Sequence, residues 1–201
     1  MSLPGTFERV YAAIKDQLRK GAFRPGERLE PAAFCEELNA SVTPIRDALH
    51  RLTGERLVEA PRNEGFRMPM LTETSLRHLY AWHRDLLMLA AARHRAPPCT
   101  AGGPAGPWPG RHEKQNALFL ALADATGNPE HVQAVQALIE RLDPIQRLED
   151  AFLDAVDAET AQIAEAVRTD DRKALRASLV RYHRRRDRIV PALLSRLHQH
   201  P

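Results

Sequence analysis

The sequence predicts a mainly α-helical protein of two domains, a small one over residues 1–71 and an all-helical one over residues 72–201. Three observations predict this division. Residues before 72 combine short helical patterns with a strand pattern, whereas residues after 111 show only the helical spacing of apolar side chains. The segment 96–110 holds five prolines and four glycines in fifteen positions, which no helix or strand tolerates. We expect this segment to be a surface loop, or else a replacement for a helix that opens the mouth of a pocket.

The composition limits the class of protein. Apolar residues make up 43% of the chain and charged residues 27%, enough for a core with a solvated exterior. A net charge of +3 excludes a general polycation and leaves room for a local basic face. The two cysteines, Cys35 and Cys99, supply neither a disulfide framework nor a zinc cluster, which favours a reducing cytoplasm. We see no membrane span and no secretion signal in the first 30 residues, so neither insertion nor export is expected.

The first helix is predicted over about residues 7–20, with Thr6 as its N-cap and Gly21 just past its end. Its buried face is predicted from apolar residues at helical spacing, namely Phe7, Val10, Tyr11, Ile14 and Leu18.

Two further short helices are predicted in the N-terminal domain. The second spans residues 31–38, because Pro31 suits a first turn and Asn39 tolerates the left-handed conformation that ends a helix. The third opens at Thr43, an N-cap candidate followed by Pro44 in the first turn. The apolar face of this third helix is formed by Ile45, Ala48, Leu49 and Leu52.

Two short strand patterns follow, at residues 57–60 and 66–68, and the polar turn 61–65 joins them into a small hairpin. Two short helices across a tight turn, one preceding helix and a hairpin make a winged helix-turn-helix.

The second domain is predicted to be an all-α bundle of about five or six helices. The patterns place helices at about 73–95, 112–126, 129–148, 149–168 and 171–197. Pro144 and Pro191 are expected to kink or end the helices that contain them.

The third helix presents polar side chains opposite its apolar face, where a helix-turn-helix meets the major groove. Arg46 is the strongest candidate for reading a base, because a guanidinium can hold guanine O6 and N7 with two hydrogen bonds. Thr43 is expected to cap the helix and to touch a phosphate. The predicted DNA-contacting residues are Thr43, Arg46, His50 and Arg51 on this helix, Arg28 in the preceding turn, and Arg62 and Arg67 in the wing. The alternative is that these arginines only solvate a small domain.

The charge of the N-terminal domain predicts a dimer. Residues 1–70 carry eleven Lys or Arg and ten Asp or Glu, a net charge of +1. Because neutralised phosphates drive DNA binding through counterion release, a single copy this neutral would bind weakly. Two copies double the contacts, so the sequence predicts a homodimer on a palindromic operator in double-stranded DNA.

Three segments of the N-terminal domain carry recognisable motifs: PGERL at 25–29, LNASVTPIRDALHRLTGERLVEA at 38–60 and NEGFRM at 63–68. Together they resemble the DNA-binding domain of GntR-type bacterial transcription regulators. The resemblance implies that Arg28, Thr43, Arg46 and Gly65 belong to the operator contacts. Val42 stands where the family usually has arginine, which implies that one base or phosphate contact is missing.

The helical half contains a second set of motifs: Leu79-Tyr80 with Arg84, Asn116 with Phe119 and Leu122, Ala125-Thr126-Gly127-Asn128, Ile163 with Ala166-Val167 and Asp170-Asp171, and Tyr182-His183. This half is similar to the ligand-binding domain of the FadR-like branch, known as FCD. Members of that branch commonly bind a divalent metal through one Asp and three His, and the metal helps to hold a carboxylate effector.

The implied metal-ligand positions fall here on Asn116, Leu120, Thr160 and His183. Leucine has no lone pair and one histidine gives too few ligands, so no metal of the family type and no cofactor is expected. A different metal site remains an alternative, built from other histidines such as His78, His83, His94, His112 and His131.

The effector is predicted to be a small carboxylate between the bundle helices, bound by Arg84, Asn116, Thr160 and His183. Arg84 would hold the carboxylate in place of the missing metal, or would instead pair with an acid of the bundle. His183 would bond in the pocket, be satisfied in the core, serve as a ligand or be exposed. The basic run at 183–188 is expected to be a solvated face or a dimer rim rather than a nucleic-acid patch.

The predicted function is a ligand-responsive transcription factor in the cytoplasm, with repression the commoner outcome in the resembled family. The alternative is a DNA-binding factor whose degenerate second domain only dimerises or recruits a partner. An enzyme is not expected, because the sequence contains no G-x-S-x-G, H-E-x-x-H or P-loop motif.

Overall fold

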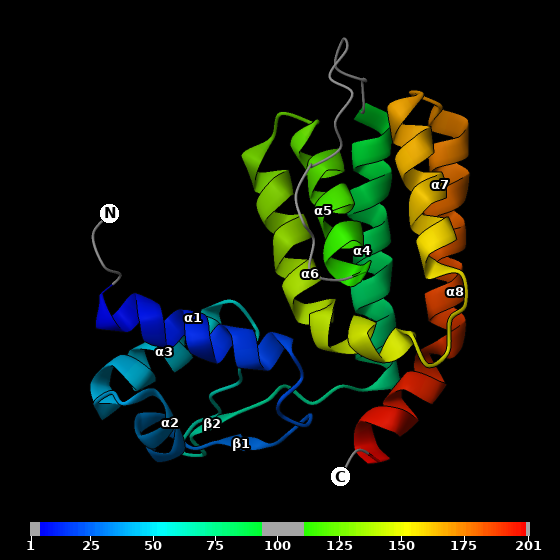
Figure 1. Ribbon diagram of the computed structural model, residues 1–201. Coiled ribbons are helices and arrows are strands. Elements are labelled where there is room, and N and C mark those ends of the chain that lie inside the picture. Colours follow the sequence, from blue (N-terminus) through cyan, green and yellow to red (C-terminus); the bar gives the residue numbers. More distant parts are fainter. Residues whose placement is uncertain (1–4, 94–110, 200–201) are drawn as a thin grey trace. The chain divides into compact units, whose positions relative to one another are not determined.

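The computed structural model describes residues 5–93 and 111–199 and divides into two compact units (Figure 1). The first unit contains the residues up to Thr72, and the second spans Glu73–Leu194. The predicted loop at 96–110, with Cys99, and also His94 lie outside the described residues. None of the helices in the described segments is long and apolar enough to cross a membrane.

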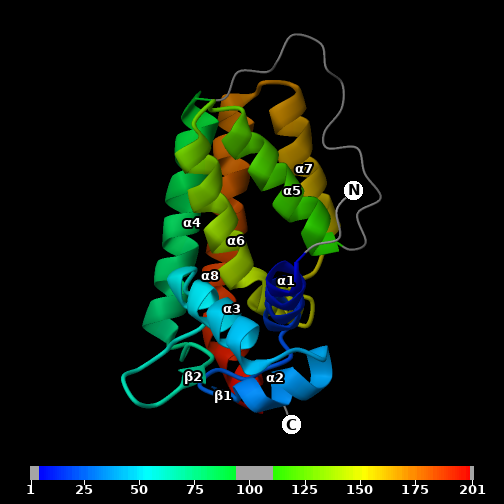
Figure 2. The same ribbon diagram turned by 90° about the vertical axis from the view of Figure 1, so that its left-hand side faces the viewer.

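The first unit is built from α1 (Thr6–Arg19), β1 (Arg28–Leu29), α2 (Pro31–Leu38), α3 (Val42–Gly54) and β2 (Phe66–Arg67). Helices α1 and α3 pack side by side (Figures 1 and 2). The apolar face predicted for the third helix is confirmed, since its four side chains are fully buried. They meet Val10, Ile14 and Leu18 of α1 in one core.

Two helix starts differ from the prediction. The N-cap of α1 is Gly5 rather than Thr6. Helix α3 begins at Val42 after Ser41, whose extended backbone (φ −71°, ψ 163°) marks the N-cap position. Thr43 is therefore already helical, and its assignment as the N-cap is wrong. The expected end of α2 is confirmed, because Asn39 has φ 47°.

The small sheet differs from a simple hairpin. Strand β1 pairs antiparallel with β2, with Arg28 opposite Arg67 and Leu29 opposite Phe66. The strand predicted at 57–60 is reduced to one bridge, in which Glu59 and Arg67 exchange backbone hydrogen bonds of 2.8 and 2.9 Å. The loop before β2 projects from the unit (Figure 2). Its turn uses left-handed backbone at Asn63 (φ 64°) and at Gly65 (φ 76°), a conformation that favours Asn and Gly.

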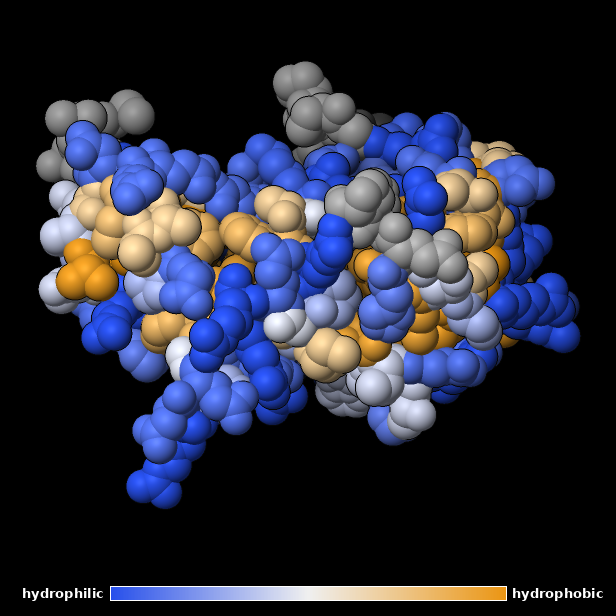
Figure 3. Space-filling view, turned by 90° about the horizontal axis from the view of Figure 1, so that it is seen from below, coloured by the Kyte–Doolittle hydropathy of each residue, from blue (hydrophilic) through white to orange (hydrophobic). Residues whose placement is uncertain are grey.

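The second unit is a bundle of five helices among the described residues (Figure 1). They are α4 (Glu73–Arg93), α5 (Arg111–Asp124), α6 (Pro129–Glu149), α7 (Val156–Arg168) and α8 (Arg172–Gln199). The predicted helix at 149–168 starts late, because residues 150–155 form turns and Ala155 has φ 54°. Helix α6 continues through Pro144 and α8 through Pro191, so neither proline ends its helix. Hydrophilic side chains are interspersed with smaller apolar areas on the surface (Figure 3).

Candidate nucleic-acid interface and buried polar cluster

A hollow of about 220 Å³ lies in the first unit between the start of α3, β1 and the loop before β2. Arg28, Arg46, Asn63 and Gly65 are among the residues that line it. Arg46 is exposed and has no hydrogen-bond or ion-pair partner in the described parts of the chain. Arg28 is 68% exposed in its side chain and donates from Nη2 to the Glu64 carbonyl at 3.2 Å. Two guanidinium groups thus border one hollow of a size that admits a polar group of a ligand.

Three further predicted residues lie on the outside of the same unit. Thr43 is exposed at the second position of α3, and Arg62 is exposed at the tip of the loop before β2. His50 is exposed as well, with its ring edge against Phe66 at a centroid distance of 4.9 Å. Ser41 forms no side-chain cap, so the first turn of α3 keeps backbone N–H groups that can meet a phosphate.

Arg51 does not join this surface. Its Nε lies 3.4 Å from Glu55, and its guanidinium carbon lies 4.1 Å from the centroid of the Tyr11 ring. The side chain therefore stabilises the contact between α3 and α1, and its role in DNA contact is not supported by its position.

Arg67 is also occupied by partners within the unit. Its Nε donates to Glu59 at 3.0 Å, and its Nη1 donates to Glu64 at 3.3 Å. Two carboxylates thus hold the guanidinium of Arg67 against the loop, which leaves Arg62 as the unpaired arginine of this loop.

The helical unit encloses polar side chains from all five of its helices, which we call the buried polar cluster. Each member is at most 6% exposed: Tyr80, His83, Gln115, Asn116, Gln146, Glu149, Glu159, Thr160, Tyr182, His183 and Arg186. Charged residues are almost never buried without partners, so each of these contacts carries information.

Arg186 is 0% exposed and lies between two carboxylates. Its Nη1 donates to Glu159 at 2.8 Å and to the Tyr182 carbonyl at 3.1 Å. Its Nε lies 2.9 Å from Glu149 Oε2 as an ion pair whose angle does not make an aligned hydrogen bond. The guanidinium carbon is 3.4 Å from the centroid of the Tyr182 ring. Nη2 has no partner within the described segments.

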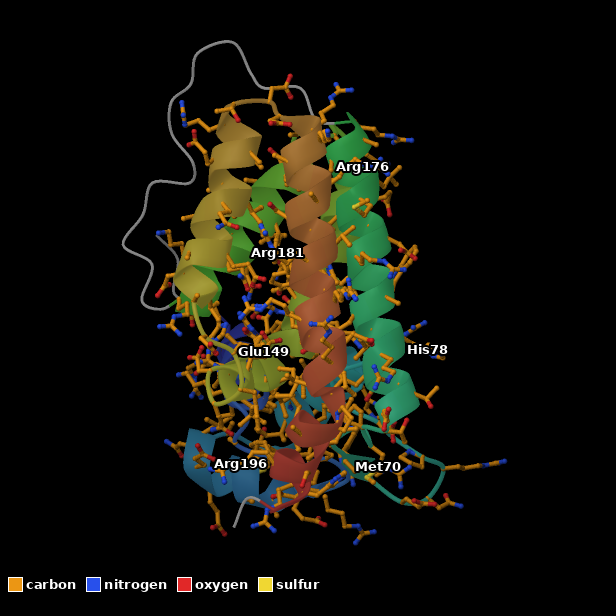
Figure 4. The ribbon with its side chains drawn as sticks, turned by 90° about the vertical axis from the view of Figure 1, so that its right-hand side faces the viewer. Met70, His78, Glu149, Arg176, Arg181 and Arg196 are labelled. Carbon is orange, nitrogen blue, oxygen red and sulfur yellow. The ribbon has the colours of Figure 1, made fainter. Side chains whose placement is uncertain are left out.

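Glu149 is 0% exposed and belongs to α6, whose end lies beside α8 (Figure 4). Its Oε1 accepts a hydrogen bond of 2.7 Å from the Tyr80 hydroxyl. Burial raises the pKa of Glu149, although Arg186 and Tyr80 act to lower it. Glu159 Oε1 lies 3.2 Å from Nη1 of Arg185. Two arginines and two glutamates therefore form one chain of ion pairs with no net charge.

The two histidines of the cluster have fixed tautomers. His183 Nδ1 lies 2.8 Å from the Leu179 carbonyl, which only accepts, so this nitrogen carries the proton. Its neutral Nε2 then accepts from His83 Nδ1 at 3.1 Å. Burial lowers the pKa of His83 well below its usual value and that of His183 to about 4, so both rings are neutral at pH 7. The lone pair of His83 Nε2 is left without a partner in the described residues.

Several other polar atoms of the cluster have no hydrogen-bond partner among the described residues, including Asn116 Oδ1, Gln115 Oε1, Gln146 Nε2 and the Tyr182 hydroxyl. An unsatisfied buried polar group costs about 1–3 kcal/mol. The combined cost would rival the total stability of a domain, about 5–15 kcal/mol. The cluster therefore requires hydrogen-bonding molecules in its interior.

Three of the four predicted effector residues belong to this cluster. Asn116 donates to Gln146 at 2.9 Å, and Thr160 accepts from Gln115 at 2.9 Å. His183 bonds His83 as described. Arg84 does not join them, because it is exposed on α4 and pairs with the neighbouring Asp85 at 3.1 Å. The open alternative for Arg84 thus resolves to an ion pair with an acid of the bundle.

The donors do not fit the metal site that the resemblance implies. Both ring nitrogens of His183 are engaged in hydrogen bonds, while Asn116 and Thr160 offer only an amide and a hydroxyl. Within residues 5–93 and 111–199, no three His, Cys, Asp or Glu side chains are grouped so as to hold a metal ion.

Sequence reasoning missed the centre of the cluster, which is Arg186 with Glu149 and Glu159. Arg186 was hidden in the basic run at 183–188, although it continues the buried stripe of Leu179 and Tyr182 at helical spacing. That periodicity was the available signal.

Comparison with known proteins agrees with the first unit. Residues 6–68 match the family described as bacterial regulatory proteins, gntR family. The Nta operon transcriptional regulator of Aminobacter aminovorans is 41% identical over 58 residues, 29% of this chain and 28% of that protein. McbR of Escherichia coli K12 is 32% identical over 98 residues, 45% of this chain and 44% of that protein. The repressor GlaR of the same organism is 30% identical over 87 residues, 41% of this chain and 40% of that protein.

The matched segments thus span less than half of these relatives, which are regulators by name and not enzymes. Two solved structures share the fold over 94% of this chain and 99% of their own. A GntR regulator from Rhodococcus sp. RHA1 has a TM-score of 0.73 at 18% identity, and Escherichia coli McbR has 0.68 at 20%. The chain therefore carries the helix-turn-helix domain of the GntR family of bacterial regulators over residues 6–68.

Proposed function

We propose that this protein is a transcriptional regulator that binds a palindromic operator as a homodimer and responds to an effector in its helical unit. The observation that carries the proposal is the hollow bordered by Arg28 and Arg46, at the start of the second helix of a helix-turn-helix. The family match over residues 6–68 supports it. Such a regulator works where the chromosome lies, in the bacterial cytoplasm.

Helix α3 is the element that would enter the major groove, with its first turns toward the bases. Arg46 has a free guanidinium there and would read a guanine through two hydrogen bonds. Thr43 and His50, exposed on the same helix, would contact the DNA beside it. Arg28, Gly65 and the unpaired Arg62 would follow the phosphate backbone, which positions the helix without specifying sequence.

A dimer follows from the small charge of the first unit. A net charge of +1 over residues 1–70 releases few counterions, so one copy supplies little affinity. Two copies on half-sites about one helical turn of DNA apart, roughly 34–36 Å, would double the phosphate contacts and require a palindrome.

The buried polar cluster supports a sensing role for the helical unit, which we assign to the FCD type. Its unpartnered atoms need a hydrogen-bonding ligand, and a ligand shifts DNA affinity only if it prefers one of two arrangements of the dimer. We take repression as the outcome, as in the relative GlaR, which is named a repressor. A degenerate unit that only dimerises is the second candidate, because the balanced charges around Arg186 suit a closed core.

The test is DNA binding by the purified full chain to the region upstream of its own gene. We expect a shift at one palindromic site, two chains per site by light scattering, and weaker binding as salt rises. Equal affinity for unrelated DNA of the same length, or one chain per site, would contradict the proposal.

A further inference from the structure

The chemistry of the buried polar cluster limits the class of ligand that it can take. We propose that the helical unit binds an uncharged ligand bearing hydroxyl or amide groups, and that it rejects carboxylates. This inference rests on the proposed function, in which the helical unit binds an effector.

The first step of the argument is charge. Glu159 Oε2 lies 2.8 Å from Nη1 of Arg186, and Glu149 Oε2 lies 2.9 Å from its Nε. The remaining group, Nη2, is the part of the guanidinium that a ligand can reach. A carboxylate bound there would lie beside two carboxylates that already contact the same planar group. Like charges repel strongly where burial lowers the dielectric constant, so an anion is disfavoured.

A cation gains little from the same cluster. Arg185 lies 3.2 Å from Glu159 Oε1, so each glutamate already has an arginine beside it. His83 and His183 are neutral and add no charge. The charges of the cluster are balanced within the protein, and an uncharged ligand is the one that leaves this balance unchanged.

The second step is hydrogen bonding. His83 Nε2 and Asn116 Oδ1 are buried acceptors without a donor among the described side chains, while Gln146 Nε2 and Arg186 Nη2 are donors without an acceptor. A carboxylate only accepts, so it would leave His83 and Asn116 unsatisfied. A hydroxyl both donates and accepts, and a primary amide does the same through its two ends. Groups of this kind can satisfy both sets of atoms.

Arg84, the residue expected to hold a carboxylate, gives no support to an anionic ligand. Its guanidinium is exposed and pairs with Asp85. Arg186 is the buried arginine of the unit, and its two carboxylate partners have taken the place that an anionic ligand would occupy.

The experiment uses the full chain and matched pairs of probes that differ in charge alone: lactamide against lactate, and glucose against gluconate. Binding is measured by calorimetry and by the shift in melting temperature at constant ionic strength. Two variants test the reason. Glu149→Gln removes one buried negative charge and keeps the size of the side chain. Glu165→Gln removes an exposed charge that pairs with Arg168 and serves as the control.

We expect the uncharged member of at least one pair to bind the wild-type chain and raise its melting temperature, while its carboxylate partner does not. Glu149→Gln should bind the carboxylate about tenfold more tightly than the wild type, because Arg186 then keeps one acidic partner. Glu165→Gln should behave as the wild type.

Two results would overturn the inference. If lactate or gluconate binds the wild-type chain as tightly as its uncharged partner, the ligand class is wrong while a sensing unit remains. If neither member of either pair binds and Glu149→Gln gains no carboxylate affinity, the cluster is a structural core. Operator binding, measured separately, then decides whether the DNA-binding function stands.

Discussion

Replacing Arg186 by methionine should destabilise the helical unit far more than replacing an exposed arginine of the same helix. The change removes a 0% exposed guanidinium and leaves Glu149 and Glu159, at 0% and 4% exposure, without it. Breaking a buried ion pair from one side costs about 3–5 kcal/mol. A chain of this size loses about 2–4 °C of melting temperature per kcal/mol, so Tm should fall by roughly 6–20 °C.

The loss should depend on pH in a defined direction. Burial already raises the pKa of Glu149 in the folded state, and removing Arg186 takes away a group that lowers it. A raised folded-state pKa means that the stability linked to Glu149 is fully present below the unfolded-state pKa and is lost as pH rises through the folded value. The variant should therefore recover stability relative to the wild type as the pH is lowered from 7 toward 4.5.

The assay is urea unfolding followed by circular dichroism across this pH range. Arg176→Met is the matched control, because Arg176 is exposed on α8 and has no partner in the described residues (Figure 4). Its free energy of unfolding should change by no more than about 0.5 kcal/mol. A similar loss in both variants, or a loss for Arg186→Met that does not change with pH, would refute the reasoning.

Three further predictions concern single residues. Arg62→Ala should weaken binding to all DNA sequences alike and reduce the salt slope by about 1 per site contacted, measured by anisotropy; a changed base preference would contradict a phosphate contact. His183 has a folded pKa of about 4 against about 6.5 when unfolded, so its contribution to stability is present above pH 6.5 and lost as the pH falls through 4. The unfolding free energy of His183→Gln should thus fall less over that range, by up to about 3 kcal/mol, and an unchanged slope would disprove the shift. Leu49→Ala should cost about 2–5 kcal/mol in urea unfolding, because Leu49 is 0% exposed; a loss below about 1 kcal/mol would place it outside the core.

The helices and their buried faces could be predicted because a helical face repeats at a spacing visible in the sequence. The predicted range 31–38 agrees with α2, and the stripe from Ile45 to Leu52 is fully buried. Strand β1 could not be predicted in the same way, because two residues contain no period. The start of α7 at Val156 depends on the left-handed backbone of Ala155, which no pattern in the sequence indicates.

The candidate sites divide along the same line. Exposure of Arg46 followed from its position opposite the apolar face, which local spacing determines. The partners of Arg51 and Arg67 depend on tertiary packing, so their engagement with Tyr11, Glu55 and the loop carboxylates was not visible. Burial of Arg186 requires acids from two other helices, and only the assembled bundle brings them together.

The most direct test of the account compares Arg46→Ala with Arg51→Ala in binding to the operator by fluorescence anisotropy. Both arginines are exposed on α3, but one borders the hollow while the other lies against Tyr11 of α1. We predict that Arg46→Ala loses about 1–3 kcal/mol of binding free energy, a factor of about 5 to 150 in Kd. Arg51→Ala should keep its affinity within about twofold, since it loses no DNA contact. Wild-type affinity in Arg46→Ala, or an equal loss in both variants, would contradict the assignment of α3 as the helix that reads DNA.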